Sequence, residues 1–303
     1  MIVVDRLTRR FGARRGITDV CFEVAPGEVF GYLGPNGAGK SVTIRILLGL
    51  YRATSGRAQV FGLDPGRDSV AIHRRVGYLP GELALYPRLT GQQHLDRFAA
   101  VRGLTDTKLR DALIERFTVE VDRPVHVLSK GNRQKIGLVL AFMHRPDLLV
   151  LDEPTSGLDP LMQDEFAHLV RETVDDGRTV LLSSHELDEV QRVVDRLAII
   201  KDGHIVVTDT VDGLRQAAPR TVQLRFSTPP DPQVFAALDG VRVVGGGDPR
   251  QVMLSVTGSV APLLKVVAPL EPVDITARPA DLDELFLSYY RTDRATEPGI
   301  DAR

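Results

Sequence analysis

The sequence predicts an α/β fold built on a mostly parallel β-sheet that is flanked by helices. Short apolar runs with polar or acidic ends have the composition of strands that are buried on both faces. Helical patterns separate these runs, and this alternation favours parallel pairing of the strands. The runs lie at residues 29–33, 147–151 and 179–183.

Three smaller features are added to this sheet. Apolar residues recur with helical spacing from about 87 to 135, which predicts a helical subdomain inserted into the sheet domain. At 199–207 two apolar runs surround Asp202 and Gly203, and this pattern predicts a β-hairpin. Short strand-like runs near the N-terminus indicate an antiparallel piece; they lie at 2–5, 20–24 and 58–61.

The composition changes after about residue 218, where prolines and glycines become frequent. We therefore predict two domains, 1–218 and 219–303. The pattern in the second domain has the order β-α-β-β-α-β, which resembles a small ferredoxin-like α+β unit. We expect the polar tail after residue 291 to be disordered. The predicted strands lie at 222–226, 241–244, 252–256 and 273–277, and the helices at 232–238, 260–267 and 281–290.

Composition and charge limit the function classes. Hydrophobic residues make up 43% and charged residues 26% of the 303 residues, which is ordinary for a soluble globular protein. The formal net charge of -2 gives no global attraction to nucleic acid, so we expect no nucleic-acid partner. We find neither a signal-peptide pattern nor an apolar run near 18 residues long. A role at a membrane would therefore need another chain to supply the membrane part.

The single cysteine, Cys21, excludes a disulfide within the chain. It lies in the alternating stretch 20–24. A cysteine in such a stretch predicts a buried strand residue.

The run from Gly34 to Ser41 matches the phosphate-binding pattern G-x-x-x-x-G-K-[ST] in full, and an apolar helix is predicted after it at 42–50. Glycines let backbone N–H groups approach phosphates, and the helix start adds its positive dipole end. Lys40 offers a compact charge to the β- and γ-phosphates, and the Ser41 hydroxyl can bind Mg²⁺. We therefore predict a RecA-like P-loop NTPase fold that binds and hydrolyses MgATP. The predicted nucleotide-binding residues are Gly34, Pro35, Asn36, Gly37, Ala38, Gly39, Lys40, Ser41 and Val42.

Two carboxylates and a histidine follow the next apolar strands. Asp152 and Glu153 come directly after one strand, at the sheet edge where ligands bind in α/β folds. We predict that Asp152 holds Mg²⁺ and that Glu153 orients the water that attacks ATP. His185 follows another strand and opens a predicted helix at 185–194, and we expect it to contact the γ-phosphate. Taken alone, a histidine at a helix start is more often an ordinary surface residue, and the alternative for the two acids is a solvated pair that caps the strand.

These motifs, in this order, resemble those of ABC-type ATPases over residues 1–215. The run LSKGN at 128–132 resembles the family's LSGGQ signature, and SGLD at 156–159 resembles its D-loop. His185 resembles the switch histidine. Phe11 stands where the family has the aromatic residue that stacks on adenine.

The resemblance implies that two ATPase domains pair head to tail and trap two ATP molecules between them. Each site would join the P-loop of one copy to Ser129 and Gly131 of the other. Because this chain carries one cassette, it implies a homodimer or a paired homologue. Hydrolysis would then release the dimer that ATP binding closes.

The chain departs from the family pattern in two places. Lys130 replaces a glycine of the signature and Asn132 replaces its glutamine, whereas Ser129 and Gly131 are kept. The family's Q-loop glutamine is missing after the strand VGYLP. Glu82 stands near that point, and a carboxylate there can bind Mg²⁺ or water.

Within the family the chain resembles the ATPase subunits of ABC-2-type exporters, in particular those of drug and antibiotic efflux. The runs GYLPGELALYPRLTG, SKGNRQK and ARPADLDELFLSYY carry this resemblance. It implies a separate membrane-spanning permease and a place at the cytoplasmic face of the cell membrane. We expect contact with the permease at 83–89, unless Leu85, Tyr86 and Leu89 pack the core of the helical subdomain.

Two other functions stay open at this point. One is a soluble ABC ATPase that acts on ribosomes or DNA, and the other is a degenerate subunit that senses nucleotide. The C-terminal domain carries no catalytic pattern, so it is expected either to regulate the ATPase or to brace its dimer.

Overall fold

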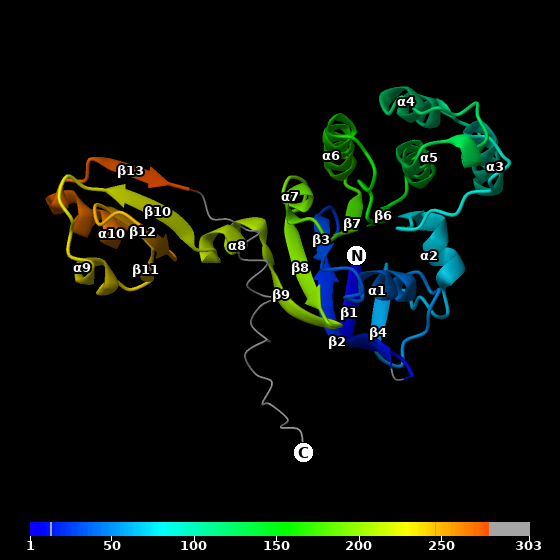
Figure 1. Cartoon of the computed structure of the whole chain (residues 1–303). Helices are drawn as coiled ribbons and strands as arrows, with labels where there is room; N and C mark the ends of the chain where they lie inside the picture. The colour runs from blue at the N-terminus through cyan, green and yellow to red at the C-terminus, as the bar shows by residue number, and fades with distance from the viewer. Residues whose placement is uncertain (13, 246, 279–303) are drawn as a thin grey trace, which may run out of the picture. The chain divides into compact units, whose positions relative to one another are not determined.

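The computed structural model describes residues 1–12, 14–245 and 247–278. The chain divides into two units, Met1–Thr208 and Asp209–Arg303 (Figure 1). The composition of the sequence predicts a domain boundary between residues 218 and 219. The division into functional domains 1–218 and 219–303 stays a prediction. The helix predicted at 281–290 and the tail after 291 lie outside the described residues.

A six-stranded sheet forms the centre of the first unit, with the order β5-β6-β7-β3-β8-β9 (Figure 1). The pairings β5–β6, β6–β7, β7–β3 and β3–β8 are parallel, as the sequence predicts. Every residue of β3, β6 and β7 is buried, which explains their uniform apolar composition. The strands are β3 (Val29–Leu33), β5 (Val76–Leu79), β6 (Leu148–Asp152), β7 (Thr179–Ser184), β8 (Arg196–Lys201) and β9 (His204–Thr210).

The predicted antiparallel piece is a three-stranded sheet with the order β2-β1-β4. Its strands are β1 (Ile2–Phe11), β2 (Arg14–Val24) and β4 (Ser55–Val60). The prediction that Cys21 is buried is wrong, because Cys21 is exposed. Side chains alternate between the faces of a strand, and Val20, Phe22 and Val24 take the inner face of β2.

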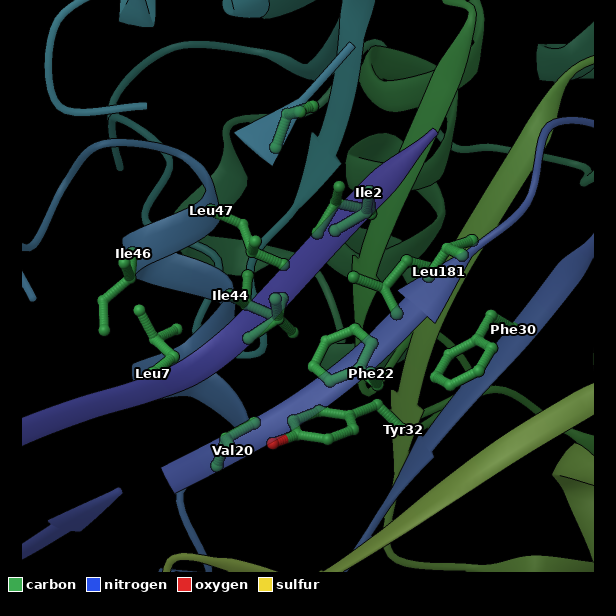
Figure 2. Close-up of a cluster of buried hydrophobic side chains, with 14 of the residues drawn as sticks. Ile2, Leu7, Val20, Phe22, Phe30, Tyr32, Ile44, Ile46, Leu47 and Leu181 are labelled. Carbon is green, nitrogen blue, oxygen red and sulfur yellow. The ribbon is translucent and has the colours of Figure 1, made fainter. Parts of the chain in front are cut away.

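A hydrophobic core lies between this sheet, the parallel sheet and α1 (Lys40–Leu47) (Figure 2). The ring of Phe22 on β2 stacks on Phe30 of β3, with centroids 5.4 Å apart, and lies 5.2 Å from Tyr32. Burial raises the pKa of the Tyr32 phenol, whose oxygen lies 3.1 Å from Thr43 Oγ1 on α1. The core therefore fixes α1 and β3 relative to each other, and with them the loop that joins them.

The inserted helical segment is present, and α3 (Gly91–Arg102) and α4 (Lys108–Arg116) both pack on α5 (Lys130–Phe142) (Figure 1). The other helices of this unit are α2 (Ser69–Arg75), the 3₁₀ turn η1 (Val125–Val127), α6 (Pro160–Asp175) and α7 (Leu187–Val190).

The helix predicted at 185–194 is shorter in the structure, because α7 spans only Leu187–Val190. The Ser184 hydroxyl accepts a hydrogen bond from Glu186 N over 3.0 Å. Glu186 itself has extended backbone angles. A side chain that bonds the nearby backbone in this way competes with helix formation.

In the second unit the sheet has the order β11-β12-β10-β13 with every pairing antiparallel. Together with the β-α-β-β-α-β order this is the predicted ferredoxin-like arrangement. Its core contains Phe226, Phe235, Leu254 and Leu263. The elements are α8 (Val211–Ala217), β10 (Arg220–Arg225), α9 (Gln233–Ala236), β11 (Val241–Gly245), β12 (Gln251–Val256), α10 (Ala261–Val267), the 3₁₀ turn η2 (Ala268–Leu270) and β13 (Asp274–Ala277).

In the described part of the chain, no helix has both the length and the apolar character that crossing a bilayer requires.

Arg116 joins the helical segment to α6. Its guanidinium pairs with Glu165 and, through Nη1 at 2.6 Å and Nη2 at 2.9 Å, with Glu172. These hydrogen bonds hold the pKa of Glu172 below its usual value. Arg116 therefore ties α4 to α6 through a two-pronged ion pair, the geometry in which such pairs contribute most.

We expect Arg116→Met to lower the free energy of unfolding by about 1 kcal/mol at pH 7. A carboxyl whose pKa is lowered by folding stabilises the protein above its unfolded pKa, and this stability is lost as pH falls. The difference between wild type and variant should therefore shrink at acidic pH in urea titrations. Arg123→Met removes an exposed pair with Glu120 on the same segment and is the control. A pH-independent difference, or an equal loss in the control, would contradict the assignment.

Candidate active site

The phosphate loop Gly34–Ser41 joins β3 to α1 and is shaped by glycine. Gly39 has a φ of 115°, a conformation that side chains rarely adopt. A Cβ at Gly39 would lie 2.5 Å from Ile17 Cγ2, and one at Gly34 would lie 2.4 Å from the Ile200 carbonyl oxygen. Close packing against Ile17 and Ile200 thus favours glycine at both ends of the loop.

The ammonium of Lys40 is buried, with the residue only 5% exposed. Its Nζ donates to the Gly34 carbonyl oxygen and lies 3.1 Å from Glu153 Oε1. A buried charge needs such partners because it has lost its water. Lys40 therefore connects the phosphate loop to the segment that follows β6.

Asp152 ends β6 and is buried, and hydroxyl groups bind both of its carboxylate oxygens. Ser41 Oγ donates to Oδ2 over 2.7 Å, and Ser183 Oγ of β7 donates to Oδ1. The predicted pair of Ser41 and Asp152 is thus brought into direct contact. Hydroxyl and carboxylate oxygens are the hard ligands that suit Mg²⁺.

Glu153 is held between two cationic or ionisable groups. Its Oε2 lies 2.7 Å from His185 Nδ1, and its Oε1 faces Lys40. Its backbone N–H donates to the Ser183 carbonyl oxygen over 3.1 Å. The φ of Glu153 is 52°, which is strained for a residue with a side chain. Strained residues of this kind cluster at functional sites.

Two further predicted residues are Phe11 and Glu82. Phe11 is half-buried at the end of β1, where its ring makes an edge-on contact with Tyr51 at 5.7 Å between centroids. The guanidinium of Arg9 lies 4.8 Å from the Phe11 ring centre. Glu82 is exposed, and the preceding Gly81 passes so close to Asp152 that a Cβ there would lie 3.3 Å from the carboxylate.

The predicted signature residues stand at the start of α5. Ser129 is its N-cap residue, and its hydroxyl accepts a hydrogen bond from Asn132 N over 3.1 Å. Gly131 abuts the backbone of Gly157, where a Cβ would lie 2.5 Å from the carbonyl oxygen. Among the described residues, no hydrogen bond or ion pair joins Ser129 or Gly131 to the phosphate loop or to Asp152. One copy of the chain therefore does not bring these two groups together.

Sequence reasoning missed two residues of the site. Gln134 is buried, and its Nε2 donates to the backbone oxygens of Glu153, at 3.1 Å, and Pro154, at 2.9 Å. Ser183 binds the Asp152 carboxylate. Gln134 is a polar residue on an otherwise apolar face of α5, and that contrast was the available signal for it, whereas β7 also carries Thr179 and Ser184 and so does not single out Ser183.

Comparisons with known proteins agree with these motifs. The family model described as "ABC transporter" matches residues 17–156. "Daunorubicin resistance ATP-binding protein DrrA3" of Streptomyces coeruleorubidus is 34% identical over 311 residues, covering 97% of this chain and 96% of that protein. "Bacitracin transport ATP-binding protein BcrA" of Bacillus licheniformis is 33% identical over 75% of each chain.

Solved structures show the same fold. An ATP-binding subunit of an ABC transporter superposes with a TM-score of 0.66 and 31% identity, over 71% of this chain and 92% of that one. The dimeric cassette MJ0796 bound to ADP and Pi superposes with a TM-score of 0.63 over 70% of this chain and 99% of that one. Because the two sequences are only 20% identical, this match supports the fold alone. From the site and these matches together, we conclude that the chain belongs to the ABC transporter family as one of its ATP-binding, ATP-hydrolysing subunits.

Proposed function

We propose that this chain hydrolyses MgATP to power the export of a small drug- or antibiotic-like molecule through a separate membrane-spanning permease. The observation that carries the catalytic part is the contact series Lys40–Glu153–His185 beside Ser41 and Asp152. The relatives named for daunorubicin resistance and bacitracin transport support the class of cargo. The chain would sit at the cytoplasmic face of the membrane, held there by the permease.

The residues around Asp152 fit Mg²⁺. In the part of the chain that the structure describes, no group of three or more His, Cys, Asp or Glu side chains forms a metal cage. Mg²⁺ needs no such cage, since it is usually bound by one or two protein oxygens together with phosphates and water. Ser41 and Asp152 would hold it, and it would neutralise charge on the phosphates of ATP.

Lys40 and Glu153 have different roles in hydrolysis: Lys40 binds phosphate and Glu153 accepts a proton. The backbone N–H groups of the phosphate loop and the Lys40 ammonium would bind the β- and γ-phosphates. Lys40 thereby exchanges the Glu153 carboxylate for phosphate oxygens. Glu153 Oε1 is then free to accept the proton of the water that attacks the γ-phosphorus, while the bond to the leaving ADP oxygen breaks. His185 holds the other carboxylate oxygen through Nδ1, and its Nε2, which lies 3.6 Å from Glu186 Oε1, would exchange that partner for the γ-phosphate.

The remaining assignments complete the nucleotide site. Phe11 stacks on adenine, and Ser129 and Gly131 contact the γ-phosphate held by a second copy in a head-to-tail dimer. The exposure of Ser129 supports this contact. Glu82 replaces the missing glutamine as a ligand of Mg²⁺ or water, which the closeness of Gly81 to the Asp152 carboxylate supports.

The permease contact is proposed at residues 83–89. Tyr86 is 69% exposed there, so it does not pack the core of the helical segment. Leu85 and Leu89 are only half-buried. Exposed aromatic residues of this kind anchor many protein interfaces. We propose residues 219–303 as an accessory domain that regulates the ATPase or braces its dimer.

Replacing Glu153 by Gln should lower kcat by about 10²–10³-fold, because the general base is lost, while ATP still binds. Phosphate release and equilibrium ATP binding would be measured on the purified chain with its permease. Glu115→Gln removes an exposed carboxylate of α4 and should behave as wild type. Equal turnover in Glu153→Gln and wild type would overturn the catalytic assignment. Absence of turnover in wild type would favour a nucleotide-sensing subunit.

Replacing Glu82 by Ala should raise the Mg²⁺ concentration needed for half-maximal hydrolysis by about tenfold, as expected when an outer metal partner is lost. Glu82→Gln restores the family's side chain and should keep nearly full activity. The measurement is ATP hydrolysis as a function of Mg²⁺ at saturating ATP. An Mg²⁺ dependence in Glu82→Ala that matches wild type would show that this carboxylate plays no part.

A further inference from the structure

Three residues at the start of α5 hold the segment that follows Glu153. Gln134 donates to the backbone oxygens of Glu153 and Pro154. One turn earlier, Gly131 lies against the backbone of Gly157. Residues 130 and 134 are four apart and therefore share one face of the helix. This face of α5 thus contacts the segment 153–157 along its length.

Lys130 makes the third of these contacts. Its Nζ donates to Ser156 Oγ over 2.7 Å. Its aliphatic stem covers Gly157, where a Cβ would meet Lys130 Cδ, Cγ and Cε at 3.2–3.5 Å. Both ends of the side chain are therefore engaged, the stem by packing and the ammonium by a charge-assisted hydrogen bond.

A glycine at this position, as in the LSGGQ signature, has no side chain with which to make either contact. Lys130 also follows Ser129, the residue proposed to contact the γ-phosphate of the second copy. If the start of α5 moves when Ser129 binds that phosphate, Lys130 would move Ser156 and Gly157 with it, because it contacts both residues. From there the chain leads back over three residues to Glu153.

We propose that Lys130 is a positioning residue that fastens the segment 153–157 to the start of α5, so that phosphate contact by one copy places the Glu153 of that same copy for hydrolysis. This inference rests on the proposed ATP-driven dimer. It links the two nucleotide sites, because the nucleotide of one copy sets the catalytic carboxylate of the other. Such a link is a coupling between sites and shows as cooperativity in ATP.

The test compares two single variants with their combination. Lys130→Met keeps an apolar stem over Gly157 but cannot donate a hydrogen bond, and Ser156→Ala removes the acceptor. Lys108→Met is the matched control, since Lys108 is also an exposed first residue of an α-helix, in α4. Steady-state ATP hydrolysis gives kcat and the Hill coefficient. ATP binding is measured on each variant with Glu153→Gln added, and thermal unfolding reports on folding.

Each single variant should lower kcat by about fivefold, the effect of one hydrogen bond, and bring the Hill coefficient toward 1. ATP binding and the unfolding temperature should be unchanged. The double variant should be no worse than either single variant, because both remove the same contact. Additive losses would overturn the proposal. So would a loss in Lys130→Met without one in Ser156→Ala, which would mean that the lysine acts by its charge on phosphate.

Failure of the proposed function would look different. Wild type would then show no ATP hydrolysis, or Glu153→Gln would hydrolyse ATP as well as wild type. If wild type is active and cooperative but all the Lys130 and Ser156 variants match it, the proposal for Lys130 alone is wrong.

Discussion

A positive charge buried at the start of α1 must be paired, and the site is organised around that requirement. Lys40 is almost fully buried, and its partners are a loop carbonyl and the carboxylate of Glu153. Removing one member of such a pair leaves the other charge buried and uncompensated. The pair needs β3 and β6 in the same sheet, and the order β6-β7-β3 places one strand between them. That strand, β7, carries Ser183 and leads to His185.

The sheet could be predicted from sequence because its strands are buried on both faces and therefore uniformly apolar. The run 29–33 coincides with β3, and 179–183 differs from β7 by one residue. Cys21 was misplaced because it shares its face of β2 with Glu23, while Val20, Phe22 and Val24 take the buried face. The start of α7 was also misplaced, because the hydrogen bond from Glu186 N to Ser184 Oγ competes with the helix there.

The site could be predicted where its chemistry lies in contiguous motifs, as in Gly34–Ser41 or Asp152 and Glu153. Gln134 and Ser183 were missed because their partners are 19 and 31 residues away along the chain. Lys130 was visible as a departure from the signature, but its bond to Ser156 spans 26 residues. Contacts of this range are made by packing, so the sequence shows at most a polar residue among apolar ones and not the partner that it binds. The fold must therefore be known before these side chains can be assigned.

The strained backbone of Glu153 shows what this packing achieves. A positive φ on such a residue costs about 1–3 kcal/mol and persists only when its surroundings over-determine it. Here the N–H is bound by β7 and the carbonyl by Gln134 of α5, while the carboxylate faces Lys40 and His185. Three segments, namely α1, α5 and the end of β7 with His185, thus fix one residue. Because each segment contacts a different group of Glu153, a displacement of one of them would act on the geometry of this residue, which is the physical basis of the coupling proposed through Lys130.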